Sequence, residues 1–174
     1  MKRIGIVAGI LFLFGTIAYG QASAQTAKAD VLNAKGEKVG ALTLTQEADG
    51  VRVAVEASNL PPGFHGFHIH AVGKCEPPFT SAAGHFNPTN QSHSHHAGDL
   101  PNLLVNADGK ASAVLKSTRF KIADLFDADG SALIVHADPD NHANIASRYK
   151  PDPDQATLST GDAGGRIGCG VISK

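Results

Sequence analysis

The chain has 174 residues, with 15 basic and 16 acidic side chains and a formal net charge of −1. This length fits one domain with a sizeable core, and the near-neutral charge excludes both a strongly basic nucleic-acid binder and an acidic disordered chain. All nine histidines fall between His65 and His142. Because solvated histidines would be scattered along the chain, this placement indicates a site that uses imidazole groups.

The first residues have the pattern of a secretory signal peptide. Lys2 and Arg3 precede an apolar run at 4–19, and residues 21–25 carry an A-x-A cleavage site. The run is short for a membrane span, and an uncleaved membrane anchor is the alternative. We expect residues 1–24 to be removed after Ala24. The remaining domain, 25–174, is expected to be exported without a membrane attachment, to the periplasm in preference to the extracellular space.

Short strands follow one another through the rest of the chain. Period-two alternation or short apolar runs predict strands at 42–45, 51–56, 66–70, 103–106, 111–115, 132–135 and 166–172. Asp49-Gly50 and Asp108-Gly109 each separate two of these strands and predict two hairpins. One helical turn is expected at 120–126. The pattern indicates an all-β fold, an antiparallel sandwich or barrel of about eight strands.

Two segments, 71–100 and 136–165, are longer than ordinary connections and are expected to be functional loops. The first contains Cys75, and Cys169 lies in the last predicted strand. In an oxidising compartment, two cysteines in one small domain are expected to pair, so we predict a Cys75–Cys169 disulfide. Two buried free thiols are the alternative.

The first histidine motif is Gly-Phe-His-Ile-His at 66–70. Side chains two residues apart face the same side of a strand, so His68 and His70 are expected to project together. His136, which ends a neighbouring strand, could supply a third metal ligand. Two surface histidines are the alternative for this motif taken alone.

The second motif begins with Gly-His-Phe-Asn-Pro at 84–88 and continues through His93, His95, His96 and Asp99. Three imidazoles and one carboxylate form a closed tetrahedral shell that suits Zn²⁺. A flexible, histidine-rich surface loop is the alternative, but it explains Asp99 poorly.

These strings, together with Val135-His136 and the sequence Gly-Asp-Ala-Gly-Gly-Arg-Ile-Gly-Cys-Gly at 161–170, resemble those of the copper–zinc superoxide dismutases. The resemblance covers nearly all of residues 25–174 in order. It implies a Greek-key β-sandwich or barrel that uses a copper ion and a zinc ion. The implied ligands are His68, His70, His85 and His136 for copper, and His85, His93, His96 and Asp99 for zinc.

The resemblance also implies roles for three further features. His85 would bridge the two metals and exchange a proton during catalysis. Asp140 would accept hydrogen bonds from His68 and His93, although a turn residue after Pro139 is the alternative. Arg166 would attract and position the superoxide anion. Lys74, Arg148 and Lys150 are further candidates for the attractive field.

The zinc region departs from the family pattern, because only Ser94 and His95 separate His93 from His96. His93 is preferred as the ligand for its distance from His85, and His95 is the alternative. His65 and His142 have no assigned role and are expected to be exposed.

The implied reaction is the dismutation of superoxide to dioxygen and hydrogen peroxide, which would protect the cell envelope. Superoxide is the expected partner, and no nucleic acid is expected to bind. A homodimer, common in the family, is left open. Two rival functions are an exported metal reservoir, which needs no steering arginine, and a zinc hydrolase, which needs an open coordination position.

Overall fold

The computed structural model describes residues 25–143 and 153–174. The expected signal peptide at 1–24 lies outside the described residues, as do Arg148 and Lys150. Within the described part, no helix is both long and apolar enough to cross a membrane.

The described part of the chain contains nine strands. Their bounds are β1 (Thr26–Leu32), β2 (Lys38–Glu47), β3 (Gly50–Ala57), β4 (Gly63–His65), β5 (Phe67–His70), β6 (Leu103–Val105), β7 (Ala111–Ser117), β8 (Ala132–His136) and β9 (Arg166–Val171). Three short helices accompany them: η1 (Thr80–Ala82), η2 (Ile122–Leu125) and α1 (Gln155–Thr160).

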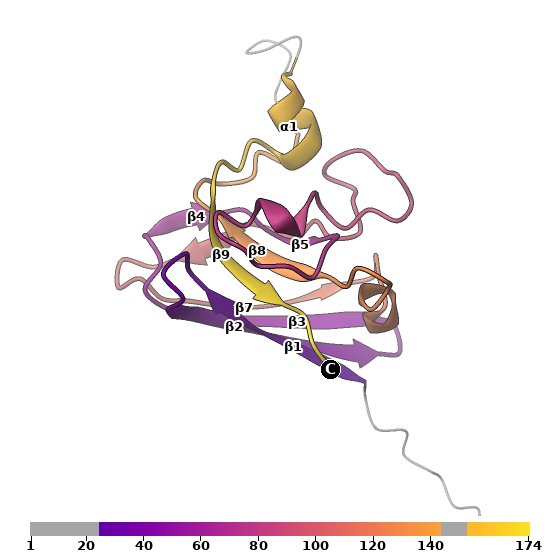
Figure 1. Cartoon of the computed structure of the whole chain (residues 1–174). Coiled ribbons are helices and arrows are strands. Elements are labelled where there is room, and N and C mark those ends of the chain that lie inside the picture. The colour runs from indigo at the N-terminus through magenta and orange to yellow at the C-terminus, as the bar shows by residue number, and fades with distance from the viewer. Residues whose placement is uncertain (1–24, 144–152) are drawn as a thin grey trace, which may run out of the picture.

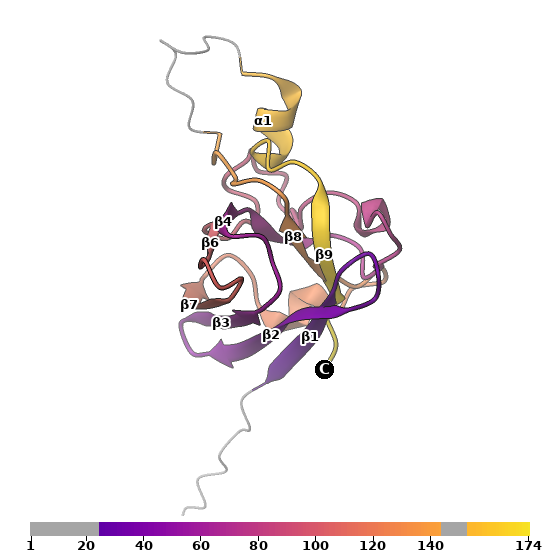
Figure 2. The same ribbon diagram turned by 90° about the vertical axis from the view of Figure 1, so that its left-hand side faces the viewer.

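One antiparallel sheet of seven strands, in the order β5-β8-β9-β1-β2-β3-β7, curls around the core. Figures 1 and 2 show β1, β2 and β3 on one side of the molecule, β5, β8 and β9 on the other, and α1 projecting at one end. Several neighbours in the sheet are not consecutive in the chain, as in Greek-key folds. The predicted all-β fold class is therefore confirmed.

The first predicted hairpin is also confirmed. β2 and β3 pair antiparallel from Gly40 opposite Ala57 to Glu47 opposite Gly50 at the turn. The alternation continues into β1, which buries every second residue and was missed by the sequence analysis.

The second predicted hairpin is wrong. Residues 106–110 do form a turn, in which the amide of Asn106 donates to the carbonyl of Lys110 at 2.8 Å. However, β6 pairs with β4 in a separate two-stranded sheet, and β7 pairs with β3. The turn signal at Asp108-Gly109 fixes where the chain reverses, but it does not fix which sheet each strand joins.

β5 and β8 are buried on both faces, and this burial positions the site. Phe67 and Ile69 point into the hydrophobic core and are almost completely buried. His68 and His70 alternate with them and are equally buried on the opposite face, beneath the long loops.

A disulfide joins Cys75 to Cys169, as predicted, with 5.6 Å between the two Cα atoms. Cys75 lies near the start of the first long loop and Cys169 lies in β9. The bridge therefore ties the loop that carries several histidines to an interior strand of the seven-stranded sheet.

Candidate metal centre

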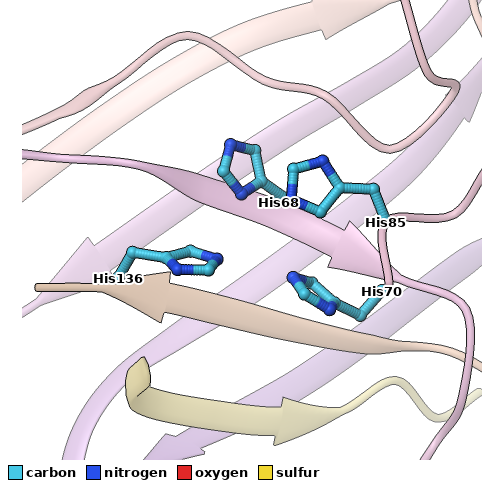
Figure 3. A group of neighbouring side chains, drawn as sticks. All are labelled: His68, His70, His85 and His136. Atoms are coloured by element: carbon cyan, nitrogen blue, oxygen red, sulfur yellow. The ribbon is translucent and has the colours of Figure 1, made fainter. Parts of the chain in front are cut away.

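Four histidines converge at the face of β5 that points away from the core. His68 and His70 project from β5, His136 from the end of β8, and His85 from the loop after η1 (Figure 3). One ligand atom from each of the four lies within 4.8 Å of those of the others. We call these residues the four-histidine set.

Each ring of this set has one buried nitrogen without a hydrogen-bond partner. These atoms are His68 Nδ1, His70 Nε2, His85 Nε2 and His136 Nε2. An unpaired polar atom in a protein interior is costly, so four of them around one point call for a ligand. A set of imidazole nitrogens is a donor set that suits copper.

The second nitrogen of three rings is fixed by another group. His68 Nε2 donates to Asp140 Oδ2 at 2.8 Å, His70 Nδ1 to the carbonyl of Ala83 at 2.9 Å, and His136 Nδ1 to the carbonyl of Gly164 at 3.2 Å. These bonds place the proton on the outer nitrogen, which leaves a lone pair on the inner one.

Burial keeps these rings uncharged. It lowers the pKa of His68 to about 4 and that of His136 to about 3, and it holds the pKa of His70 well below its ordinary value. The neighbouring cationic Arg166 acts in the same direction on His70 and His136. Neutral rings at physiological pH are the form that binds a metal.

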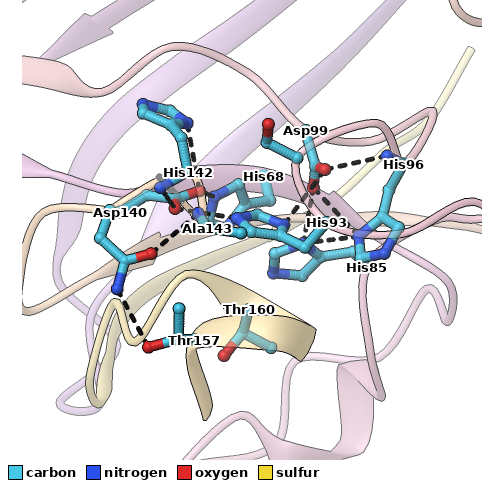
Figure 4. Close-up of polar contacts among 12 residues, drawn as sticks. His68, His85, His93, His96, Asp99, Asp140, His142, Ala143, Thr157 and Thr160 are labelled. Atoms are coloured by element: carbon cyan, nitrogen blue, oxygen red, sulfur yellow. Dashed lines mark hydrogen bonds and ion pairs between the residues drawn. The ribbon is translucent and has the colours of Figure 1, made fainter. Parts of the chain in front are cut away.

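A second set contains His85, His93, His96 and Asp99, all buried and within the same 4.8 Å limit. Asp99 lies at its centre (Figure 4): its carboxylate oxygens are 2.7 Å from His85 Nδ1 and 3.2 Å from the Nδ1 atoms of His93 and His96. We call these residues the aspartate set, and the segment that carries them, 85–99, the ligand loop. Three imidazoles and a carboxylate fit zinc.

His85 belongs to both sets. Its Nε2 atom is one of the unpaired atoms of the four-histidine set, whereas its Nδ1 atom faces Asp99 and lies 3.3 Å from His96 Nδ1. A single imidazole ring therefore separates the two sets, with one nitrogen directed at each.

Asp140 connects the two sets from the other side. It accepts from His68 Nε2 at 2.8 Å and from His93 Nε2 at 2.9 Å, and its own side chain is inaccessible to solvent. Burial alone would raise the pKa of this carboxyl, but the hydrogen bonds from His68 and His93 outweigh burial and hold the pKa well below its usual range.

His93 is placed between two carboxylates. Burial alone would lower its pKa, but the hydrogen bonds with Asp140 and Asp99 outweigh burial and raise the pKa to about 9. Its Nδ1 atom lies 3.2 Å from Asp99 and its Nε2 atom 2.9 Å from Asp140. A cation bound at Nδ1 would replace a proton there.

Arg166 lies at the start of β9, close to the four-histidine set. Its guanidinium donates to the carbonyl of Phe79 at 2.6 Å and to that of Ala83 at 2.5 Å. The Ala83 carbonyl also accepts from His70 Nδ1, so one oxygen atom orients both a histidine of the set and the arginine. Burial lowers the pKa of Arg166, although a guanidinium stays charged at physiological pH.

The remaining histidines are placed differently. His95 is exposed and lies outside both sets, whereas His93 lies within one. The expectation that His65 is exposed is wrong: its ring is buried, with Nδ1 2.8 Å from the carbonyl oxygen of His136 and Nε2 2.8 Å from that of Pro61. His142 is half-buried beside Asp140.

Sequence reasoning missed the groups that orient the rings through the backbone. The carbonyls of Ala83 and Gly164 belong to residues whose side chains carry no chemistry. Asn102 was also missed, although its side chain pairs with both the amide and the carbonyl of Asp140 at 2.8 Å. The signal in the sequence that could have pointed to Asn102 is its position just after the predicted ligand segment.

The fold and the two sets define a β-barrel metalloprotein with adjoining copper-type and zinc-type sites that share one imidazole. Residues 38–172 match the sequence model of a family described as copper/zinc superoxide dismutase (SODC). The chain therefore belongs to the copper/zinc superoxide dismutase family, whose members use copper and zinc.

Individual relatives agree with this assignment. The chain is 41% identical over 157 residues to superoxide dismutase [Cu-Zn] 1 of Aquifex aeolicus, covering 83% of this chain and 85% of the relative. It is 36% identical to superoxide dismutase [Cu-Zn] 2 of the same organism, covering 99% of both. The solved Cu/Zn superoxide dismutase from Brucella abortus superimposes with a TM-score of 0.68 at 30% identity, covering 86% of this chain and all of that one.

Proposed function

We propose that the protein converts two superoxide anions and two protons into dioxygen and hydrogen peroxide. The four-histidine set would hold copper and the aspartate set would hold zinc, with His85 shared. The observation that carries the proposal is the convergence of four unpaired, buried ring nitrogens at one point.

When bound, copper supplies one-electron oxidation and reduction, and zinc supplies a fixed charge without redox chemistry. The protein supplies the geometry around them. Three of the four rings are locked by bonds to Asp140, Ala83 and Gly164. Donors that are held in place before the ligand arrives need little rearrangement when it binds.

His85 is the residue that would hold and move a proton. Its Nδ1 atom faces the aspartate set, so a proton can be exchanged only at Nε2, the atom that faces the four-histidine set. Peroxide formation consumes protons, and a ring nitrogen at this place can deliver one directly to the reacting oxygen.

Arg166 would attract and orient the anion. Its guanidinium is anchored by two backbone carbonyls and is half-buried beside His70 and His136, where its charge is weakly screened. A local positive charge is what a small anionic substrate needs in a protein whose net charge is slightly negative.

We also propose that the protein is exported. Residues 1–24 would act as a secretory signal peptide, and the domain at 25–174 would work in the periplasm, protecting the cell envelope from superoxide. The basic start, the apolar run and the A-x-A site support this placement. The Cys75–Cys169 disulfide is consistent with an oxidising compartment.

Metal analysis paired with superoxide turnover tests the function. The protein is loaded with copper and zinc, and the decay of superoxide is followed before copper removal, after it and after copper is restored. We expect turnover to disappear and return with copper. A protein that binds both metals tightly but does not accelerate superoxide decay would instead be a metal reservoir.

A further inference from the structure

Backbone hydrogen bonds fasten the ligand loop to β5 near its two ends. The amide of Phe86 donates to the carbonyl of Ile69 at 2.8 Å, the amide of Ile69 to the carbonyl of Gly98 at 2.9 Å, and the amide of Gly98 to the carbonyl of Phe86 at 2.8 Å. These bonds hold the loop against β5 before His93 and after His96. They do not reach residues 92–96.

Two side chains from other parts of the fold hold residues 92–96. Asp140 accepts from His93 Nε2, and Arg119 Nη1 donates to the carbonyl oxygens of Ser94 at 2.8 Å and His96 at 3.4 Å. Across the described ranges 25–143 and 153–174, no other side chain from outside the ligand loop makes a hydrogen bond to this stretch. Ser94 directly follows His93, a member of the aspartate set, and His96 is itself a member of that set.

Arg119 comes from the opposite side of a cavity. It follows β7, where its backbone amide donates to Ser117 Oγ at 3.3 Å. The cavity, of about 380 Å³, is lined by Ser94, Asp99 and Leu100 from one side and by Ser117, Thr118 and Arg119 from the other. Through its bonds to the carbonyls of Ser94 and His96, the guanidinium of Arg119 connects the two groups of lining residues.

We propose that Arg119 is a positioning residue for zinc, holding the backbone at Ser94 and His96 so that the rings of His93 and His96 stay directed at the same point. The inference rests on the proposed zinc role of the aspartate set. A guanidinium suits this task because its planar fork offers several N–H groups in fixed directions, whereas a lysine offers a point charge on a flexible stem.

The experiment compares Arg119→Ala and Arg119→Lys with Lys35→Ala, which removes one positive charge from the exposed turn between β1 and β2. Each protein is loaded with copper and zinc, and zinc release to a colorimetric chelator is followed. We expect release from Arg119→Ala to be roughly 10-fold faster than from the unaltered protein, as for other residues that orient metal ligands. Arg119→Lys should be intermediate and Lys35→Ala unchanged.

Two further readouts separate positioning from general stability. Cobalt(II) bound in place of zinc should show altered visible bands in Arg119→Ala and unaltered bands in Lys35→Ala. The thermal unfolding midpoint of the metal-free protein should be the same for Arg119→Ala and Lys35→Ala. Equal zinc release from Arg119→Ala and the unaltered protein would overturn the proposal.

If Arg119→Ala does not fold, Arg119→Lys decides the matter, because release no faster than from Lys35→Ala overturns the proposal. Failure of the proposed function gives a different result. Protein that binds copper and zinc without accelerating superoxide decay refutes the dismutase function and leaves the zinc-release comparison valid. Unchanged zinc release in a working dismutase refutes only the role of Arg119.

Discussion

At the scale of single residues, the sequence offers either His93 or His95 as a candidate zinc ligand. The side chain of His93 is buried between Asp99 and Asp140, while His95, two positions later, is exposed. Both residues lie at a plausible distance along the chain from His85. Folding therefore distinguishes two histidines that spacing left as alternatives.

We expect His93→Ala to abolish stoichiometric zinc binding and His95→Ala to leave it unchanged, because only His93 contributes a nitrogen to the aspartate set. Zinc content after dialysis against a weak chelator measures this. Copper content serves as the internal control. Zinc loss from His95→Ala, with zinc retained in His93→Ala, would contradict the assignment.

Asp140 pairs with one histidine of each set, His68 and His93. Asp140→Asn removes the negative charge and replaces one acceptor by a donor that cannot pair with a ring N–H. We expect zinc affinity to fall by roughly 10- to 100-fold, since partners that orient metal-binding histidines have effects of this size. Competition with a chelator of known affinity gives the measurement, and unchanged affinity would show that Asp140 does not orient His93.

Arg166→Ala is expected to lower superoxide turnover by roughly 10-fold or more and to flatten its dependence on ionic strength, because a local charge speeds the encounter with an anion. Arg166→Lys should retain part of both effects. Copper content is the control, since Arg166 contributes no atom to the four-histidine set. Full turnover at low salt in the alanine variant would refute a steering role.

At the scale of elements, the C-terminal end of α1 lies against Asp140 and His93. Its C-cap residue, Gly161, has φ +64, and its carbonyl accepts from the amide of Asn141. A Cβ atom at Gly161 would overlap Asp140 Oδ1 and lie 2.7 Å from His93 Nε2. The end of this helix therefore closes directly over the Asp140–His93 hydrogen bond.

Gly161→Ala is accordingly expected to weaken zinc binding without changing any ligand, because the added methyl displaces the Asp140 carboxylate. The strained backbone adds about 1 kcal/mol of destabilisation. Gly165→Ala is the matched control, since a Cβ there meets nothing within 4 Å. Zinc titration of the two variants side by side gives the comparison, and equal affinities would contradict the close approach.

The elements that carry the copper-type ligands were predictable, and some others were not. The alternation at His68 and His70 predicts their common face because strand geometry has a fixed period of two. β4 and α1 escaped prediction because each is short and takes its stability from the neighbours it packs against. His65 was misjudged for a related reason: its burial depends on two carbonyls, at Pro61 and His136, that only the fold brings together.

At the scale of the whole molecule, the disulfide connects positions separated by 94 residues. In the chain-entropy description, a crosslink over such a loop stabilises the folded state by about 4–5 kcal/mol. We expect the Cys75→Ser, Cys169→Ser double variant to lose a comparable amount, measured by guanidinium unfolding of the metal-free protein. A loss below about 1 kcal/mol would show that the loop is held mainly by other contacts, such as those of Arg166.

The position of β9 determines when this protein can fold. The strand lies between β8 and β1, so the β5–β8 pair reaches the β1-β2-β3-β7 group through it. β9 also follows the other eight strands in the described part of the chain. The barrel therefore cannot close before β9 has been made, and this closure is slow because β9 and β1 lie far apart in the sequence. The disulfide and the placement of Arg166 both require β9, so the site is completed only once this strand has joined the sheet.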